Sequence, residues 1–141
     1  MKDSTINYLT DTGPLVALLN HDDMHHDWAK AAFAVLGEPT ATTETVIAEA
    51  AHLLRKYRPA MIALTEAVRG GQVVILPILA QNAHAIAEKL RKYDRMDLAD
   101  ATLVALSEQY PRAKLITIDE KDFTIYRRRD GRSVPCIMPK Q

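Results

Sequence analysis

Four carboxylic acids stand in segments that are otherwise apolar, and they are the first candidates for chemistry. Asp11 follows the apolar run 6–9, and Asp119 ends the run LITI. Glu49 interrupts VIAEAAHLL, and Asp100 interrupts LADATLVAL. A buried carboxylate without a partner is neutralised by a shift of its pKa or destabilises the fold. No Lys or Arg lies within these motifs. The simplest partner is therefore a hard divalent cation, and oxygen ligands favour Mg²⁺ or Mn²⁺ over Zn²⁺.

Each acid taken alone also has a structural explanation. Asp11 suits an Asx turn or a helix N-cap, and Asp119 suits a cap of the helix predicted after it. Glu49 suits a solvent-facing position between two apolar ridges. Asp97 lies three residues before Asp100 on the same helix face, where it is either a cap or a supporting acid. The coincidence of four acids in apolar segments favours a shared metal site.

The elements that must position these acids follow from the apolar periodicity and from the Gly and Pro residues. Thr43 is a plausible N-cap, and Gly37 and Gly70 are plausible helix ends. We expect strands over 6–9, 72–79, 114–119 and 133–138, with a brief extended stretch before Thr43. We expect helices over 14–19, 27–36, 43–58, 59–70, 81–93, 97–110 and 120–128.

Strands that alternate with helices predict an α/β domain with a mainly parallel sheet and helices on both faces. No repeat or linker divides the chain, so we expect a single domain over 1–141. Sites in such sheets form beyond the carboxyl ends of the strands. Asp11 and Asp119 both lie at that end of a predicted strand, which makes it the expected location of the site.

Composition excludes several classes of protein. Apolar residues make up 48% of the 141 residues, and Pro and Gly contribute only 7 and 5, which excludes a disordered or fibrous chain. The apolar runs are shorter than a membrane span, and charges occupy the start of the chain where a signal peptide has its apolar core. The single Cys136 forms neither an internal disulfide nor a thiolate metal site. We therefore expect a soluble, cytoplasmic protein.

The net charge is zero, but residues 112–141 hold eight basic and four acidic residues. They can form a basic patch for a phosphate backbone, or simply a solvated face. The candidate residues of such a basic, nucleic-acid-binding patch are Arg127, Arg128, Arg129 and Arg132.

Other chemistry is poorly supported. The loop with His21, His25 and His26 also holds three Asp residues, but it lacks a recognised ligand spacing and is better explained as an acidic helix start. There is no nucleophile elbow, GxGxxG motif or P-loop. Cys136 lacks a nearby His that would activate its thiol.

Four motifs, in a fixed order, are spread along nearly the whole chain. They are YLTDTGPLVALL (8–19), TTETVIAEAAHLL (42–54), MDLADATLVALSE (96–108) and LITIDEKDF (115–123). With these motifs the sequence resembles the PIN-domain ribonucleases, in particular the VapC-like toxins of type II toxin–antitoxin pairs.

The resemblance implies a PIN-like three-layer α/β/α sandwich with a small, mainly parallel central sheet. It implies a catalytic, metal-binding quartet in which Asp11 and Asp100 are the most direct Mg²⁺ ligands, completed by Glu49 and Asp119. Supporting roles fall on Asp97, Asp122, Thr12 and Thr117, the two threonines through their hydroxyls. The implied partners are an RNA substrate, a small antitoxin and a second copy of the chain in a homodimer.

The expected activity is a Mg²⁺-dependent endoribonuclease, with Mn²⁺ as a possible substitute. Metal ions held by carboxylates lower the pKa of bound water and stabilise charge on a phosphodiester, and the quartet offers no His as a general base. Two alternatives stay open: a PIN nuclease in RNA processing outside toxin–antitoxin biology, and a catalytically inactive binding module.

Overall fold

A parallel sheet organises the chain, and its strand order places the first strand at the centre. The computed structural model describes residues 6–140, so the predicted domain limits 1 and 141 fall outside the described residues. The strands lie in the order β3-β2-β1-β4-β5, and every pairing is parallel. The strands are β1 (Tyr8–Thr10), β2 (Thr40–Thr42), β3 (Val73–Ile75), β4 (Lys114–Ile116) and β5 (Cys136–Ile137). The helices are α1 (Thr12–Leu19), α2 (His26–Leu36), α3 (Glu44–Leu53), α4 (Arg58–Arg69), α5 (Ala83–Lys92), α6 (Leu98–Gln109) and α7 (Glu120–Ile125).

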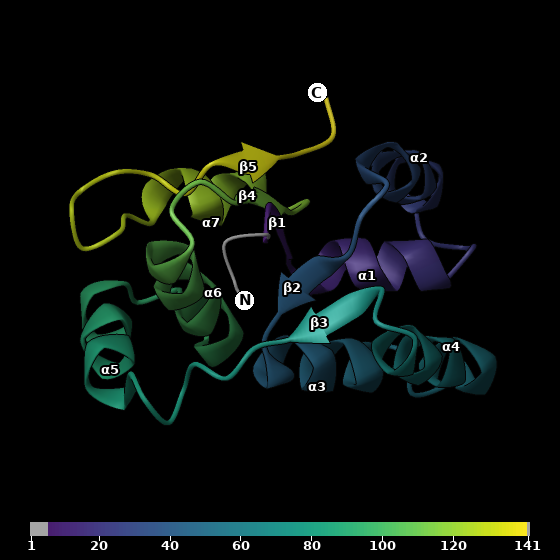
Figure 1. Ribbon diagram of the computed structural model, residues 1–141, viewed down its shortest axis with the longest axis horizontal. Helices are drawn as coiled ribbons and strands as arrows, with labels where there is room; N and C mark the ends of the chain where they lie inside the picture. The colour runs from purple at the N-terminus through teal and green to yellow at the C-terminus, as the bar shows by residue number, and fades with distance from the viewer. Residues whose placement is uncertain (1–5, 141) are drawn as a thin grey trace.

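Helices cover both sides of this sheet. Figure 1 shows α5 and α6 on the left of the strands, and α1, α2 and α4 on the right. The strands run through the middle, where Leu9 of β1 stands opposite Ala41 of β2 and Leu115 of β4. All three side chains are buried. The predicted α/β fold, with a small parallel sheet between helices, is confirmed.

Local signals in the sequence set most element boundaries. Thr43 caps α3 by accepting a hydrogen bond from the N–H of Val46, and α2 ends at Gly37, whose φ of 63° lies in the left-handed region. Several predicted lengths were wrong, among them that of the last strand, expected over 133–138 but covering only Cys136–Ile137. The helix expected over 43–58 ends at Leu53, and the strand expected over 72–79 covers only Val73–Ile75. That strand lies at the sheet edge beside the three-residue β2, and the proline at position 77 has no N–H to extend the pairing.

One helix passes through the interior along most of its length. Every residue from Ala101 to Ser107 in α6 is buried, which explains why LADATLVAL shows no polar face. The half-buried Asp100 lies in the first turn of this helix, and Asp97 caps it by accepting from the N–H of Asp100. The core helix therefore begins at an acidic N-terminus.

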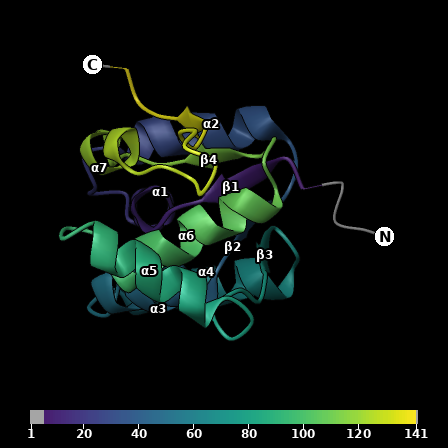
Figure 2. The same ribbon diagram turned by 90° about the vertical axis from the view of Figure 1, so that its left-hand side faces the viewer.

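The carboxyl ends of β1 and β4 meet at one edge of the sheet. Thr10 of β1 stands opposite Ile116 of β4, and α1 and α7 begin just beyond these positions. Figure 2 shows α1 and α7 at the same end of the strands. Within residues 6–140, none of the helices has both the length and the apolar character that crossing a bilayer requires.

Candidate functional site

Asp11 lies between β1 and α1, and two donors fix its carboxylate. Its Oδ1 accepts a hydrogen bond from the N–H of Thr12 (2.8 Å), so Asp11 is the N-cap of α1. Its Oδ2 accepts one from Oγ1 of Thr117 (2.7 Å), just after β4. Asp11 is only 7% exposed, and burial raises its pKa to about 6. The two hydrogen bonds lower this pKa, while the charges of Asp119 and Glu49 raise it.

Glu49 reaches the same place from α3. The hydroxyl of Thr12 donates to its Oε1 at 2.8 Å, which links α3 to the start of α1. Glu49 is half-buried, so it is not the fully solvated acid that one explanation of its sequence position allowed. The adjacent residues Asp11 and Thr12 therefore connect the first helix to both β4 and α3.

Asp100 comes to the site from the tip of α6. Its Oδ2 accepts a hydrogen bond from the hydroxyl of the buried Tyr126 at 2.9 Å. The pKa of Asp100 is raised to about 8, first by burial and then by the negative charges of Asp97 and Asp11. The hydrogen bond from Tyr126 acts in the opposite direction. Burial and the charge of Asp100 raise the pKa of the Tyr126 hydroxyl, so this group remains a donor at neutral pH.

Asp119 completes the set from the start of α7. Its Oδ1 accepts a hydrogen bond from the N–H of Asp122, and its own N–H donates to Oγ1 of Thr117. Burial is the main reason why the pKa of Asp119 is raised, and the charge of Arg95 lowers it. The Nε of Arg95 lies 3.4 Å from a carboxylate oxygen of Asp122, so a cation borders the acids here.

These acids form one electrostatic cluster. The charges of Asp119 and Glu49 act on Asp11, and those of Asp11 and Asp119 act on Asp100. The cluster is not yet a coordination shell: within residues 6–140, no three His, Cys, Asp or Glu side chains are grouped closely enough to hold a metal ion. The carboxylates instead accept hydrogen bonds from hydroxyls and backbone groups.

The carboxylate oxygens of these acids are nevertheless ligands that suit a hard divalent cation. All four candidate ligands are carboxylates, and no thiol or imidazole hydrogen bond to them is present among the described residues. Mutual repulsion and desolvation both raise the pKa values of Asp11 and Asp100, and a bound dication would oppose both effects. Metal binding by Asp11, Glu49, Asp100 and Asp119 stays a prediction.

The basic candidates separate into two kinds. Arg127, Arg129 and Arg132 are exposed. Arg128 is 6% exposed, and its guanidinium donates to Oγ of Ser107 and to the carbonyl oxygen of Pro111. The prediction that Arg128 belongs to an exposed basic rim was wrong, because this side chain anchors its loop to the end of α6.

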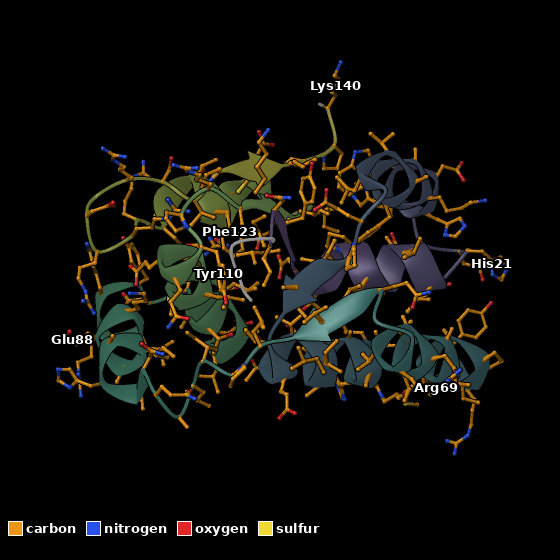
Figure 3. The ribbon with its side chains drawn as sticks, in the orientation of Figure 1. His21, Arg69, Glu88, Tyr110, Phe123 and Lys140 are labelled. Atoms are coloured by element: carbon orange, nitrogen blue, oxygen red, sulfur yellow. The ribbon has the colours of Figure 1, made fainter. Side chains whose placement is uncertain are left out.

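The His-rich loop does not form a second site. His21 lies at the periphery in Figure 3, far from the interior Phe123 of α7. Its ring contacts Tyr57 and Asp22, and Nδ1 of His26 bonds the carbonyl oxygen of Ala17. The loop is among the described residues, in which no His, Asp or Glu group fit for a metal is found.

Sequence reasoning missed two residues of the site. Tyr126 and Arg95 belong to segments with no recognisable motif, and both reach the acids only through the fold. The only local signal was the position of Tyr126 directly after the helix that Asp119 caps.

Comparison with known proteins gives a family and a fold. The family model described as the PIN domain matches residues 8–128. The crystal structure of Mycobacterium tuberculosis VapC20, described as a sarcin-ricin loop cleaving toxin, is similar with a TM-score of 0.69 and 24% sequence identity. The similarity covers 77% of this chain and 87% of that chain, and at this identity it shows a shared fold. A comparison with curated proteins gives no match.

Proposed function

This chain belongs to the PIN-domain family, and from that premise we propose that it is a Mg²⁺-dependent endoribonuclease, the toxin of a toxin–antitoxin pair. The structural similarity to a toxin that cleaves the sarcin-ricin loop supports RNA as the class of substrate. The single observation that carries the proposal is the convergence of four separate segments on one acidic edge, with Asp11 buried among them.

The proposed ligands are the four carboxylates of Asp11, Glu49, Asp100 and Asp119, with Mn²⁺ as a possible replacement for Mg²⁺. The bound ion supplies the acidity of a coordinated water and stabilises charge on the phosphodiester. The chain itself supplies orientation, because hydroxyls of Thr12, Thr117 and Tyr126 each hold one carboxylate in place. Preorganised groups of this kind need not rearrange during the reaction.

The carboxylates repel the phosphates of RNA, so RNA can approach the acidic pocket only if positive charge lies nearby. Arg95 borders the acids directly, and the exposed Arg127, Arg129 and Arg132 extend positive charge along the C-terminal part of the chain. We place the RNA backbone along these residues. Asp97 and Asp122 act as supporting acids, Asp97 by capping α6 and Asp122 by its contact with Arg95.

Cleavage of RNA by the purified protein tests the proposal. Wild-type protein is expected to cut single-stranded RNA in Mg²⁺ and to stop in EDTA. Asp11→Asn is expected to lose at least about a thousandfold in kcat/KM. Loss of one negative charge lowers the affinity for the metal ion and therefore the amount of metal-activated water. The amide can still accept from the N–H of Thr12, so the variant should fold. Full activity of Asp11→Asn would refute the metal mechanism.

The toxin role adds an antitoxin, a homodimer and action in the cytoplasm. Expression in bacteria separates this role from RNA processing. We expect wild-type protein to arrest growth, Asp11→Asn to leave growth normal, and a small protein encoded beside this chain to restore growth. Cleavage of RNA in the tube without growth arrest would favour a processing nuclease instead.

A further inference from the structure

A cavity of about 790 Å³ is bounded by α3 and α6, the helices that carry Glu49 and Asp100, although none of the four acids lines it. Its walls come from α3, α6 and the segment 75–81 that follows β3. The two helices are shared with the site: Thr45 of α3 lies one turn before Glu49, and Thr102 of α6 lies two residues after Asp100. Thr45 and Glu49 are four residues apart and share one face of α3, so a substrate held at Glu49 lies within about one helical turn of the cavity.

The charges in the cavity argue against a phosphate as its occupant. No Lys, Arg or His is among its lining residues, all of which lie in the described part of the chain, and Glu44 contributes a carboxylate. The walls are mainly aliphatic, with Ile75, Leu76 and Ile78 among them. Such a cavity excludes anions and accepts a flat, uncharged group, and its volume is of the size that small ligands occupy.

The three threonine hydroxyls at the cavity have fewer protons available than oxygen–oxygen contacts to fill. Oγ1 of Thr102 gives its only proton to the carbonyl oxygen of Ala99 (2.7 Å). Three oxygen–oxygen contacts join Thr43, Thr45 and Thr102, at 2.9, 3.0 and 2.9 Å. Only the hydroxyl protons of Thr43 and Thr45 remain, so at most two of the three contacts can be hydrogen bonds within the cluster. The cluster therefore has lone pairs in excess, and Thr45 is its half-buried member that a ligand can reach.

From these observations we infer that the cavity receives one unpaired base of the RNA substrate, next to the bond that is cut. The inference rests on the proposed function and adds a source of specificity to it. The Glu44 carboxylate only accepts hydrogen bonds, and Thr45 has a lone pair free to accept one, so the preferred base carries an exocyclic amino group, as adenine, guanine and cytosine do. Uracil offers one N–H between two carbonyl oxygens and fits worst. Splayed, unpaired bases are the usual targets of sequence-specific RNA recognition.

An abasic scan of the RNA that wild-type protein cuts tests the inference. We expect one position next to the cut bond at which removal of the base lowers kcat/KM about tenfold or more. Ala80→Phe places a ring in the cavity from an exposed loop position and should lower kcat/KM on intact RNA to the abasic level, with no further loss on the abasic RNA. Ala63→Phe, at an exposed position of α4 outside the cavity, is the matched control and should behave like wild type.

A second variant keeps the proposal testable if Ala80→Phe does not fold. Glu44→Gln removes one acceptor at an exposed position, so it should reduce the preference for amino-bearing bases over uracil at that position. The exposed Glu88→Gln is its control and should keep the preference. Circular dichroism and melting temperatures establish that each variant is folded.

The outcomes distinguish failure of the proposed base site from failure of the proposed nuclease function. Wild-type cleavage with no abasic-sensitive position, or unchanged sensitivity in folded Ala80→Phe, would overturn the base site and leave the nuclease intact. Unchanged base preference in Glu44→Gln would overturn the assigned preference. Absence of cleavage by wild-type protein on every RNA would remove both proposals. If Ala80→Phe cuts RNA normally but no longer binds the antitoxin, the cavity is a protein-binding site instead.

Discussion

At the scale of single residues, three of the four carboxylates of the site are each held by a hydrogen bond from a distant part of the chain. Thr117 holds Asp11 across 106 positions, and Thr12 holds Glu49 across 37. Tyr126 holds Asp100. The hydrogen bonds oppose the raised pKa values of Asp11 and Asp100 that burial causes. They thus favour the ionised state that a cation requires.

Removal of the hydroxyl in Tyr126→Phe tests this positioning role. A hydrogen bond to a charged group contributes roughly 1.5–3 kcal/mol, so we expect kcat/KM to fall by about ten- to a hundredfold. The pKa of Asp100 should rise further, because the hydrogen bond lowers it. The acidic limb of the pH–rate profile should therefore move to higher pH. The ring itself packs edge-on against Phe123 and Tyr93, so the fold should persist.

Tyr93→Phe is the matched control for this variant. The Tyr93 hydroxyl accepts from the N–H of Arg127 and is not bonded to an acid of the site. Its loss should leave the acidic limb where it is in wild type. A shift of equal size in both variants would show that Tyr126 acts only through packing.

The acids were predictable from the residues themselves, their partners Thr12 and Thr117 only through the family resemblance, and Tyr126 not at all. A carboxylate within an apolar run stands out by composition alone, as with Asp11 in YLTDTGPL. The capping explanations were also correct for Asp11, Asp97 and Asp119, because one side chain can cap a helix and face a site. Tyr126 carries no such contrast, since a tyrosine in a half-apolar segment has many possible partners.

At the scale of elements, caps and chain reversals were predictable, whereas helix and strand lengths depended on neighbours. Thr43 and Gly37 mark their boundaries by intrinsic backbone preferences. The length of β3 depends instead on its pairing with β2, which the local sequence does not contain. The burial of α6 on all sides follows from its contacts with α5 and α3.

Close approach of α1 to β4 depends on Gly13. A Cβ at this position would lie 2.6 Å from Cγ1 of Ile118, which is far inside normal contact. We expect Gly13→Ala to push α1 away from the end of β4 and to lengthen the contact between Asp11 and Thr117. Cleavage should fall by about tenfold or more, since small displacements in a preorganised site are costly.

A double variant identifies the cause of the Gly13 effect. Gly13→Ala with Ile118→Ala removes the clashing side chain, so we expect kcat/KM to recover relative to Gly13→Ala alone. Thermal unfolding measured in parallel separates this recovery from stability, because Ile118→Ala alone should reduce stability without a clash. If kcat/KM does not recover in the double variant, a contact other than that with Ile118 causes the loss in Gly13→Ala.

At the scale of the whole molecule, the acidic edge reduces stability when no cation is bound. Asp11 and Asp100 have folded-state pKa values of about 6 and about 8, above the ordinary value of 3.8. Between these values and 3.8 the folded state binds more protons than the unfolded state. The free energy of unfolding should therefore fall as pH rises from about 4 to about 8. For the buried Asp11 the loss is on the order of 3 kcal/mol.

Urea unfolding in EDTA across this pH range measures the effect. Wild-type protein should lose stability as pH rises, and Mg²⁺ should restore part of it at pH 8. Asp11→Asn removes one buried charge, so its stability should exceed that of wild type at pH 8 and depend less on pH and on Mg²⁺. A wild-type stability that rises over the same range would contradict the assigned electrostatics.

The pairing of β1 with β4 has a consequence for how the protein is made. Tyr8 stands opposite Lys114, so the central strand pairs with this neighbour only after residues 9–114 have been synthesised. Asp11 is synthesised before Asp100, Thr117 and Asp119. Translation products that stop before residue 100 thus lack two of the four acids. Under the proposed toxin function, activity therefore begins only after residues 100–119 have been made, which delays the exposure of the cell that synthesises the protein.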